Sequence, residues 1–266
     1  IRTSAGRQGT DEDVPFGQAT IGDGQLIPPV WSPWTLYRLF EESDILQACI
    51  RAYVDALARP YDFDYEGPKD ARQNKDVLAR EQKIRDFFRQ VNENQSWLGL
   101  MVQKELDYWA TGNGYIEVLE DRETFEPLLM YNIPPSFMRV TPLEEKSIQT
   151  WVTLRRDGKQ RELPIQRRFR KFARWLPTRK IEWFKQLGDP RVLDRTTGKY
   201  LEKTDGSFIL EKNLKPEDYA DVRANSVWWF RDVYGGQTYG IPRWVAAIAD
   251  IRGLYLSRWV NFDTLD

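Results

Sequence analysis

The segment from Tyr234 to Asp266 constrains the fold more than any other stretch, because it combines a defined helix start with a very broad apolar face. A glycine-rich turn leads into Pro242, and proline is tolerated in a first helical turn since its missing N–H would have no intrahelical partner there. We therefore predict a helix with Pro242 near its first position. Its apolar stripe comprises Trp244, Val245, Ile248, Ile251, Leu254, Tyr255 and Trp259, interrupted by Arg243, Asp250, Arg252 and Arg258.

Two further features of this helix predict its surroundings. Gly253 lies in its middle, where glycine costs about 1 kcal/mol relative to alanine, so we expect a bend or a close helix contact there. The sequence then stops at Asp266 without a recognisable cap. We therefore expect the helix to continue into further sequence.

Composition excludes most enzyme classes. The chain has one cysteine, Cys49, and no histidine. These counts exclude a disulfide framework, a cysteine-rich zinc site and a histidine-dependent triad, and we predict no enzyme activity and no cofactor. Apolar runs are too short to cross a bilayer and the first residues lack a signal-peptide pattern, which predicts a soluble protein assembled in a cytoplasm. The 11 Trp, 12 Tyr and 13 Phe indicate an assembly, since large aromatic side chains often anchor interfaces.

Both helical and strand-type periods occur, which predicts an α+β fold. The clearest helix of the first half spans 43–57, where Ser43 or Asp44 caps a row formed by Leu46, Ile50 and Val54. Cys49 falls in a second apolar row beside it, so we interpret this cysteine as a small buried hydrophobe rather than a reactive thiol. The second row consists of Ile45, Cys49, Tyr53 and Leu57.

The other predicted elements follow from the same periods and from turn residues. The helix over 76–91 is expected to turn Val77, Leu78, Ile84, Phe87, Phe88 and Val91 inward. Further helices are predicted over 33–40 and 96–110, the second capped by Ser96, and strands over 61–65, 115–120, 128–131, 137–140, 181–184 and 227–230, with a hairpin over 192–201.

Three groups of residues could be interpreted as chemical sites, but in each case a purely structural role is favoured. Asp62 and Asp64 alternate on a predicted strand and favour its solvated face over a metal site, since a third ligand is missing nearby. Asp189 and Asp194 resemble a glycosidase acid pair, but a turn and a hairpin supply such carboxylates routinely. The segment 111–114, Thr-Gly-Asn-Gly, runs from helix to strand, the reverse of a phosphate-binding loop, and predicts a helix stop.

Charge divides the chain into two halves. Residues 1–133 hold 14 Lys and Arg against 23 Asp and Glu, and the remainder holds 25 against 17. The segment 155–180 interleaves cations with aromatic residues, a pattern that suits phosphate contacts and base stacking but equally suits pairing with the acidic half of a neighbouring subunit. The candidates for either contact are Arg155, Arg156, Arg167, Arg168, Arg170, Lys171 and Arg174.

An ordered set of motifs resembles the portal proteins of tailed bacteriophages. The resemblance spans about residues 27 to 262, and no single motif decides it. It rests on Ile27-Pro28-Pro29 with Ser32-Pro33, the helix 43–57, Ala110-Thr-Gly-Asn-Gly-Tyr-Ile-Glu-Val118, Trp183-Phe-Lys-Gln-Leu-Gly-Asp-Pro-Arg191 and Tyr239-Gly-Ile-Pro-Arg-Trp244.

The resemblance implies a structural protein without an active site of its own. It implies a ring, typically dodecameric, at one vertex of the capsid in the virion, assembled in the host cytoplasm. Double-stranded DNA would pass through the channel without sequence specificity during packaging and ejection, and the major capsid protein, the terminase motor and the head–tail adaptor would be its partners, with no membrane. The alternative is a nucleic-acid-binding module acting through 155–180.

The resemblance also implies how the chain is divided. Residues 1–26 would form a flexible arm, and residues 27–233 a wing of helices and small mixed or antiparallel sheets. Residues 234–266 would begin a long stem helix, and the clip, second stem helix, tunnel loop and crown are not recognised in this sequence. The helix side chains expected at a subunit interface or the channel are Arg243, Trp244, Ile248, Arg252, Tyr255, Arg258 and Trp259.

Overall fold

The computed structural model describes residues 26–57, 59, 74–156, 159–176, 178, 180–215, 217–233 and 235–263, and these form the two compact units detailed below. Unit 1 comprises Ser136–Trp228 with the described residues before Thr35, and unit 2 comprises the described parts of Thr35–Pro135 and of Trp229–Asp266. Helices and strands are both abundant, which confirms the predicted α+β class. The predicted strand 61–65 with its two aspartates, and all of the predicted arm except its last residue, lie outside the described residues.

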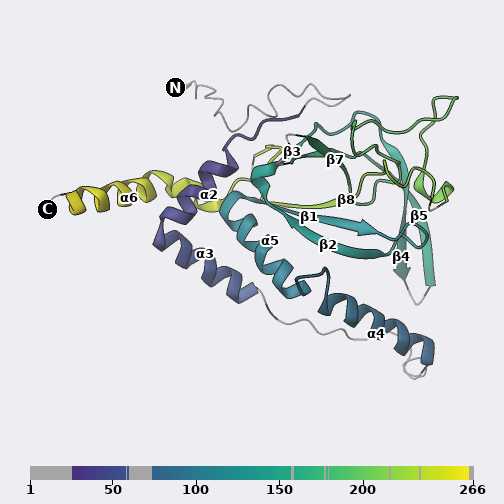
Figure 1. The fold of residues 1–266 in the computed structure, drawn as a ribbon, viewed down its shortest axis with the longest axis horizontal. Coiled ribbons are helices and arrows are strands. Elements are labelled where there is room, and N and C mark those ends of the chain that lie inside the picture. The colour runs from purple at the N-terminus through teal and green to yellow at the C-terminus, as the bar shows by residue number, and fades with distance from the viewer. Residues whose placement is uncertain are drawn as a thin grey trace. The chain divides into compact units, whose positions relative to one another are not determined.

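Unit 2 contains the helices and one edge of a sheet (Figure 1). Helix α3 lies beside α5, and β1 pairs with β2 in antiparallel register from Tyr115↔Ile133 to Val118↔Met130, with an irregularity between Leu119 and Glu120. Its elements are most of α2 (Pro33–Glu42), α3 (Asp44–Leu57), α4 (Lys75–Arg89), α5 (Trp97–Thr111), β1 (Asn113–Glu120), β2 (Pro127–Ile133), the second half of β8 (Ser226–Arg231), the 3-10 turn η5 (Arg243–Ala247) and α6 (Ile248–Asp263).

Local chemistry explains where these helices begin and end. The Ser96 hydroxyl accepts a hydrogen bond from the Gly99 N–H at 3.3 Å and so caps α5. Gly112 adopts the left-handed conformation, with φ 77°, and its N–H closes the helix on the Tyr108 carbonyl at 2.7 Å. The predicted cap and helix stop are both confirmed.

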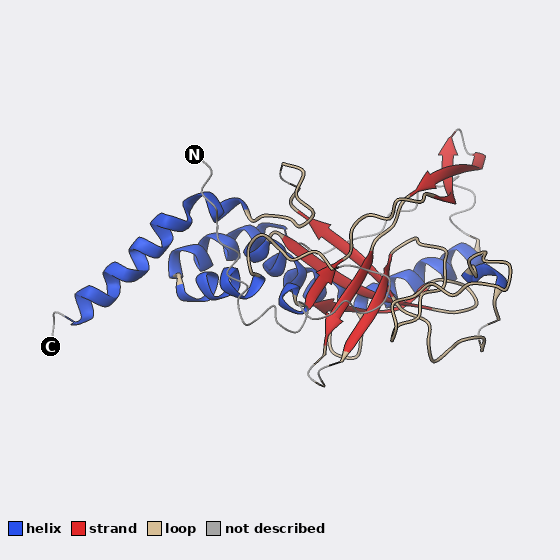
Figure 2. Ribbon diagram, turned by 90° about the horizontal axis from the view of Figure 1, so that it is seen from above, coloured by secondary structure: helices blue, strands red, loops and turns tan. Residues whose placement is uncertain are grey.

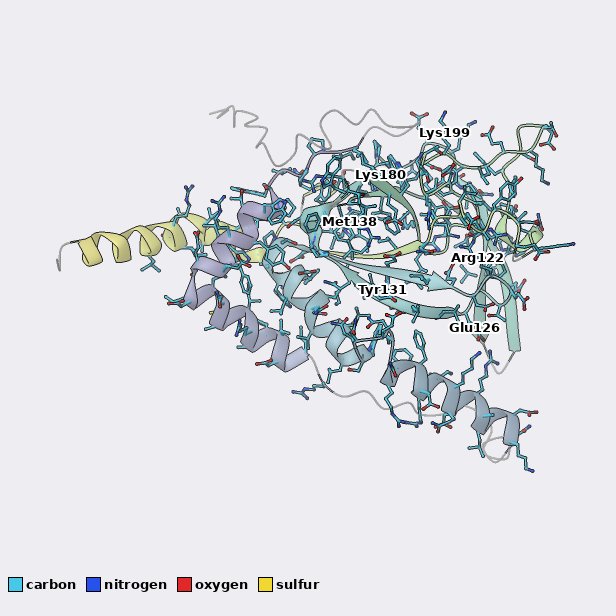
Figure 3. All side chains as sticks on the ribbon, in the orientation of Figure 1. Arg122, Glu126, Tyr131, Met138, Lys180 and Lys199 are labelled. Carbon is cyan, nitrogen blue, oxygen red and sulfur yellow. The ribbon has the colours of Figure 1, made fainter. Side chains whose placement is uncertain are left out.

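The core of unit 2 lies between α3 and α5. Leu46, Ile50 and Val54, the predicted inward row of α3, are buried together with Ala110 and Phe40. Helix α4 contacts the neighbourhood of β2 and the start of α5 (Figure 3). The Lys83 ammonium contacts the Glu126 carboxylate at 2.7 Å, and the Phe88 ring meets Trp97 edge-on at 5.0 Å. In the loop after α4 the Glu93 carboxylate accepts from the Tyr131 hydroxyl at 2.7 Å.

Two predicted inward faces are wrong. The second row of α3 is exposed, including Cys49, which is therefore not a buried hydrophobe. Helix α4 has no buried residue, although Val91 just beyond its end is fully buried. In both cases the periodicity identifies an apolar face correctly but does not specify whether another element of the same chain covers it.

Unit 1 is built on strands (Figure 2). Strand β6 (Lys171–Trp175) pairs antiparallel with β3 (Met138–Val140) and with β7 (Ile181–Gln186), and β7 pairs in parallel with the first half of β8 at Lys185↔Ser226. A separate two-stranded sheet is formed by β4 (Ile148–Arg156) and β5 (Lys159–Arg167). Short 3-10 turns occur at Pro135–Phe137 and Glu211–Asn213.

The core of unit 1 packs one face of this sheet against the predicted hairpin. Trp183, Leu193 and Ala224 are buried around Ala173. The hairpin is confirmed by the antiparallel bridge between Leu193 and Tyr200 and by the positive φ of Gly198. None of the described helices is long and apolar enough to span a membrane, and no group of three or more potential metal ligands occurs among the described residues.

Candidate functional site at the base of the C-terminal helix

Two glycine-containing stretches that lie far apart in the sequence meet in unit 2. One follows α5 at Gly112, and the other precedes η5 at Gly240. The Gly112 carbonyl accepts from the Asp232 N–H at 2.9 Å, and the Asp232 carbonyl accepts from the Ile241 N–H at 3.2 Å. The backbone that leads into the C-terminal helix is thereby joined to the turn between α5 and β1. We call this contact between the backbone at Gly112 and the backbone at Asp232, Gly240 and Ile241 the joint.

Asn113 is the side chain that joins the two stretches. Its amide nitrogen donates to the carbonyls of Thr111 at 3.1 Å and Gly240 at 3.0 Å. Its amide oxygen accepts from the Gly240 N–H at 2.9 Å and from the Trp229 indole N–H at 3.3 Å. The sequence identifies Asn113 only as a turn residue. Its one signal of a further role is that an amide side chain, with both a donor and an acceptor, lies between two glycines.

Gly240 is required because the two backbones almost touch. A Cβ atom at this position would lie 1.8 Å from the Gly112 carbonyl oxygen and 2.7 Å from the Asp232 nitrogen. Gly112 is equally confined, since a Cβ there would lie 2.6 Å from the Ile241 carbonyl carbon. Only two residues without side chains allow this approach.

The helix that follows starts on this joint. Pro242 has an extended ψ of 138° and is the N-cap of η5, next to the first helical position as predicted. The α-helical part starts only at Ile248. The Trp244 indole N–H donates to the Trp109 carbonyl at 3.0 Å. Arg243 Nε donates to the Asp232 carboxylate at 2.8 Å, and its guanidinium lies 5.7 Å from the centre of the Trp109 ring.

An aromatic cluster supports the joint from the sheet side. Trp229 on β8 stacks on Tyr115 of β1 with ring centres 6.0 Å apart and nearly parallel planes. Tyr239 meets the same indole edge-on at 6.4 Å, and the Arg231 guanidinium lies 4.6 Å from the centre of the Trp229 ring. Aromatic pairs of this kind resist displacement, so the helix base is held on both sides.

Beyond its base, α6 leaves the core of unit 2. Ile248 and Ile251 are half-buried, and Trp244 and Ile251 pack against the α3–α5 core. Arg252 is exposed, and no described atom lies within 4 Å of a Cβ built at Gly253, so the predicted close helix contact is not found among the described residues. The side chains of Tyr255, Arg258 and Trp259 lie outside the described part, and their predicted roles remain predictions.

No family model matches this chain. It is 30% identical over 249 residues to the uncharacterized protein YqbA of Bacillus subtilis (strain 168), an alignment covering 90% of this chain and 44% of that protein. It is 28% identical over 243 residues to the phage-like element PBSX protein XkdE of the same strain, covering 89% of this chain and 45% of that protein. The chain therefore spans less than half of the length of both relatives.

Comparison with solved structures concerns the fold alone. A chain in the virion of a native gene transfer agent particle superposes with a TM-score of 0.54 at 13% sequence identity. The superposition covers 92% of this chain and 48% of the other. The two chains share a fold over nearly all of the residues in this sequence.

Loss of the Asn113 side chain is expected to release the joint. In Asn113→Leu the buried Gly240 N–H and carbonyl lose their side-chain partners, and unsatisfied buried polar groups cost about 1–3 kcal/mol each. We expect unfolding free energy to fall by about 2–4 kcal/mol in urea titrations, with faster amide hydrogen exchange at Gly240 and Ile241. Asn94→Leu, a change at an exposed loop asparagine, is the matched control.

Asp107 places an acidic group in the interior of unit 2. It lies on α5 and is buried, and its carboxylate accepts from the Asn132 amide on β2 at 2.6 Å. Burial raises the pKa of Asp107 to about 7, and the Asn132 hydrogen bond offsets only part of this shift. The Asn132 amide oxygen is buried without a donor among the described residues.

This group makes stability depend on pH. Because the folded pKa of about 7 exceeds the unfolded value of 3.8, the folded state binds more protons between them and stability falls as pH rises through this window. We expect the unfolding free energy to decrease by about 2 kcal/mol from pH 5 to pH 7, and this slope to disappear in Asp107→Asn. Urea titrations at each pH provide the measurement. An unchanged slope in the variant would contradict the assignment to Asp107.

The basic candidates fall into two groups in unit 1. Arg167 and Arg168 are exposed at the end of β5, whereas the Lys171 ammonium is buried and donates to the Gly198 carbonyl at 2.8 Å. Arg170 donates to the Thr141 carbonyl at 2.8 Å, and Arg174 contacts the Glu182 carboxylate at 2.5 Å. Arg155 and Arg156 lie on β4, and their side chains are outside the described part. A DNA or inter-subunit role for these residues remains a prediction.

The two aspartates considered as an acid pair hold structural positions. Asp189 is buried in an ion pair with Arg191, and the Asp194 carboxylate accepts from the backbone N–H groups of Thr196 and Thr197. The latter is an ordinary Asx-type turn. Both carboxylates are therefore committed to the fold of unit 1.

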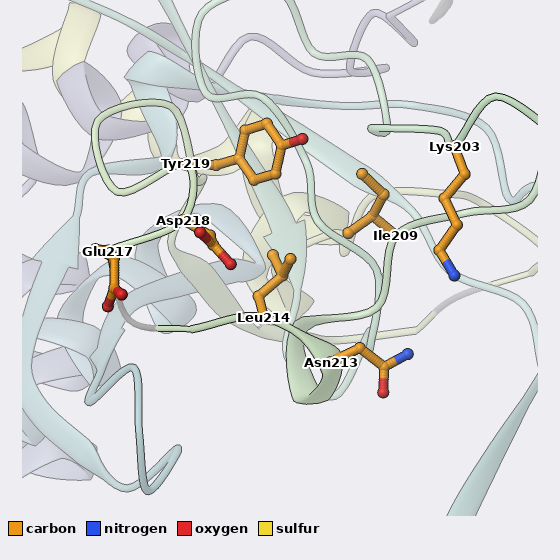
Figure 4. A pocket seen from close by; sticks show the side chains of 7 residues that line it. All are labelled: Lys203, Ile209, Asn213, Leu214, Glu217, Asp218 and Tyr219. Atoms are coloured by element: carbon orange, nitrogen blue, oxygen red, sulfur yellow. The ribbon is translucent and has the colours of Figure 1, made fainter.

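A surface hollow of about 560 Å³ also lies in unit 1 (Figure 4). Asp218 lines it, but its carboxylate accepts from the Lys215 N–H at 3.0 Å and so stabilises a turn. In Figure 4 the Lys203 ammonium lies on the side opposite Glu217. The hollow does not bring an acid and a base together, and we assign no chemistry to it. Its lining is Lys203, Ile209, Asn213, Leu214, Glu217, Asp218 and Tyr219.

Proposed function

We propose that this chain is part of a structural subunit of a phage-type particle, specifically of the ring-shaped portal at one vertex of the capsid. The observation that carries the proposal is the sequence similarity to the PBSX protein XkdE, which extends over 89% of this chain. The fold shared with a chain of a gene transfer agent virion supports it. In this proposal the ring, dodecameric by family resemblance, forms the channel through which double-stranded DNA is packaged and ejected.

The anchored helix supports the same proposal. The turn that leads into α6 is fixed by hydrogen bonds from Trp244 in η5 to α5 and from Ile241 to Asp232, just after β8. Further along, Arg252, Leu254 and Ser257 of α6 are exposed. A stem helix requires this arrangement, because its base must hold a direction while its outer residues contact neighbouring subunits. Unit 2 would then contain both the helices of the wing and the start of the stem, and α6 would line or support the channel.

The proposal assigns the energy-consuming chemistry to a partner. ATP hydrolysis would belong to the terminase motor that docks on the ring. The head–tail adaptor and the major capsid protein are the other proposed partners. DNA contacts would be made with phosphate groups and would not read the sequence.

Electron microscopy of the complete gene product tests this function. The expected result is a population of rings with a central hole. Because a ring has closed symmetry, its number of subunits should not increase with protein concentration. A particle that remains monomeric at high concentration would overturn the proposal.

A second candidate is a nucleic-acid-binding module acting through 155–180, favoured by the exposed guanidinium groups of Arg167 and Arg168. It predicts that Arg167→Gln with Arg168→Gln lowers the slope of log affinity against log salt by about 2, since each phosphate contact contributes about 0.9. Fluorescence anisotropy with duplex DNA measures the slope. An unchanged slope would exclude these two residues as phosphate contacts.

A further inference from the structure

Asn113 is followed by Gly114, and this is the only Asn–Gly dipeptide among the 266 residues of the sequence. In such a pair the backbone nitrogen of the glycine can attack the side-chain amide carbon of the asparagine, because a glycine without a Cβ leaves its nitrogen sterically open. The Asn113 side chain also holds the joint through its hydrogen bonds with Gly240. A reaction at this dipeptide would therefore act on the base of α6.

The reaction needs water but no oxidant, reductant or cofactor. The Gly114 nitrogen loses its proton and forms a bond to Cγ of Asn113, the bond between Cγ and Nδ2 breaks, and ammonia leaves. The product is a succinimide ring. Water then opens the ring at either of its carbonyl carbons. One opening gives an aspartate, and the other gives an isoaspartate, in which the main chain runs through Cβ and Cγ.

The joint binds the side-chain amide that would be attacked. Nδ2 of Asn113 donates to the Gly240 carbonyl at 3.0 Å and to the Thr111 carbonyl at 3.1 Å, and Oδ1 accepts from the Gly240 N–H at 2.9 Å. Donors on an amide oxygen make its carbon more reactive, because they stabilise the negative charge that develops on the oxygen during attack. The hydrogen bonds alone therefore do not protect Asn113, and protection has to come from backbone geometry.

The backbone around Gly114 supplies this geometry. Asn113 is the first residue of β1, and in a strand the side chain stands roughly perpendicular to the chain direction, so Cγ and the next nitrogen diverge. Ring closure requires rotation about the Cα–C bond of Asn113. The Thr111 hydroxyl lies within donating distance of the Asn113 carbonyl oxygen, at 3.1 Å, and a Cβ built on Gly114 would lie 3.0 Å from the Lys104 side chain. The peptide unit between 113 and 114 cannot rotate without breaking these contacts.

Neither product of the reaction can rebuild the joint. Aspartate places an oxygen where Nδ2 now donates, so acceptor would face acceptor at the Gly240 and Thr111 carbonyls. Isoaspartate lengthens the main chain next to Gly112 by one carbon atom. The joint has no room for this change, since a Cβ at Gly240 would already lie 1.8 Å from the Gly112 carbonyl oxygen. The reaction is therefore irreversible for the fold as well as for the side chain.

We propose that Asn113–Gly114 is a site of spontaneous deamidation that the closed joint protects, and that deamidation after the joint opens leaves it open. The rate of deamidation then measures how often the base of α6 separates from the end of α5. The proposal concerns a single chain and does not depend on the portal assignment.

Site-resolved deamidation rates in the full-length protein test the proposal. Asp205→Asn is the matched reference, because Gly206 follows it in an exposed turn and no described atom lies within 4 Å of a Cβ built there. Peptide mass spectrometry follows both sites in the same sample at one fixed pH. In the folded protein Asn113 is expected to react at least about a hundredfold more slowly than the site at 205, since it reacts only in molecules whose joint is open.

Unfolding the chain should remove this difference. In urea above the unfolding transition, the two rates are expected to agree within about threefold, because neither dipeptide then has a fixed environment. At urea concentrations below the transition, the rate at Asn113 should rise in parallel with amide hydrogen exchange at Gly240 and Ile241. Gly240→Ala, which prevents the close backbone approach, should raise the rate at Asn113 at least about tenfold and leave the site at 205 unchanged. The urea series retains the test if this variant does not fold.

Asn113→Asp reproduces the product with a normal main chain and tests whether the joint stays open. Amide hydrogen exchange at Gly240 and Ile241 is expected to be at least about tenfold faster than in the wild type, since the carboxylate cannot donate to the Gly240 carbonyl. Asn94→Asp makes the same chemical change at an exposed loop position and is the matched control. It should leave exchange at both amides unchanged.

Each part of the proposal can fail separately. Equal rates at Asn113 and at the site at 205 in the folded protein would overturn the protection. If Asn113 stayed unreacted in the unfolded chain while the site at 205 reacted, the dipeptide would not be a deamidation site. Wild-type exchange in Asn113→Asp would show that the joint closes again after the reaction. None of these results bears on whether rings form, so the portal assignment is tested independently.

Discussion

Gly240→Ala is expected to unfold the joint at the base of α6. The new methyl carbon would lie 1.8 Å from the Gly112 carbonyl oxygen and 2.7 Å from the Asp232 nitrogen, which are both backbone atoms. Backbone cannot rotate away as a flexible side chain can, so the two stretches must separate and break the hydrogen bonds that Asn113 makes to Gly240. We expect a loss of at least about 4 kcal/mol in unfolding free energy, measured by urea denaturation.

Gly253→Ala is the matched control for this substitution. Gly253 lies on α6 and is exposed, with no described atom within 4 Å of a Cβ built there. Alanine is favoured over glycine in a helix interior by about 1 kcal/mol, so this variant should be slightly more stable than the wild type. Equal stability of Gly240→Ala and the wild type would show that the close backbone approach is not maintained in solution.

Much of the local structure of this protein is predictable from sequence, because helix ends are chosen by side chains next to them. Ser96 and Gly112 mark the limits of α5 as predicted. The helix 33–40 is observed as Pro33–Glu42, and the helix 76–91 as Lys75–Arg89. These elements depend on capping and on short-range periodicity, which act within a few residues.

The candidate site is less predictable, because it depends on contacts between residues more than a hundred positions apart. Both stretches of the joint carry recognisable motifs, but no local rule indicates that Gly112 and Gly240 touch. The exposed row of α3 illustrates the same limit, since its spacing is helical and apolar whether or not another element covers it. Tyr53 of this row stacks on Trp109 of α5 and is still 58% exposed, whereas Cys49 is exposed, and the spacing alone does not distinguish these positions from the buried row.

Charged residues show a third limit of sequence reasoning. The sequence places Lys171 and Arg174 in one group with Arg167 and Arg168, because all four belong to one basic run. The fold separates them, since β6 is an interior strand of its sheet and turns Lys171 inward, whereas the end of β5 faces solvent. Only side-chain burial distinguishes a cation that supports the fold from one that can meet a partner.

Asp189→Asn is expected to have the second large effect, through a buried ion pair in unit 1. Both oxygens of Asp189 are committed: Oδ1 accepts from Arg191 Nε at 2.9 Å, and Oδ2 accepts from Arg191 Nη2 at 2.7 Å and from the Tyr200 hydroxyl at 2.9 Å. Burial, followed by the Asp189 charge, raises the pKa of Tyr200, so the phenol remains a donor. Asparagine removes the charge and turns an amide N–H₂ toward one of these donors, leaving Arg191 with the partly buried Glu144 as its remaining carboxylate partner. Removing one partner of a buried pair costs about 3–5 kcal/mol, which urea denaturation will measure.

Two further variants distinguish the ion pair from a general effect of lost charge. Asp205→Asn alters an exposed turn whose Oδ1 accepts from the Ser207 N–H at 2.8 Å, and since asparagine retains that oxygen, we expect a change within about 0.5 kcal/mol. Asp189→Leu combined with Arg191→Met removes both charges, and it should be less destabilised than Asp189→Asn because no buried guanidinium is left with Glu144 as its only carboxylate partner. If the double variant were the less stable of the two, packing of the Arg191 guanidinium over the Tyr200 ring, at 3.6 Å from its centre, would be the larger contribution.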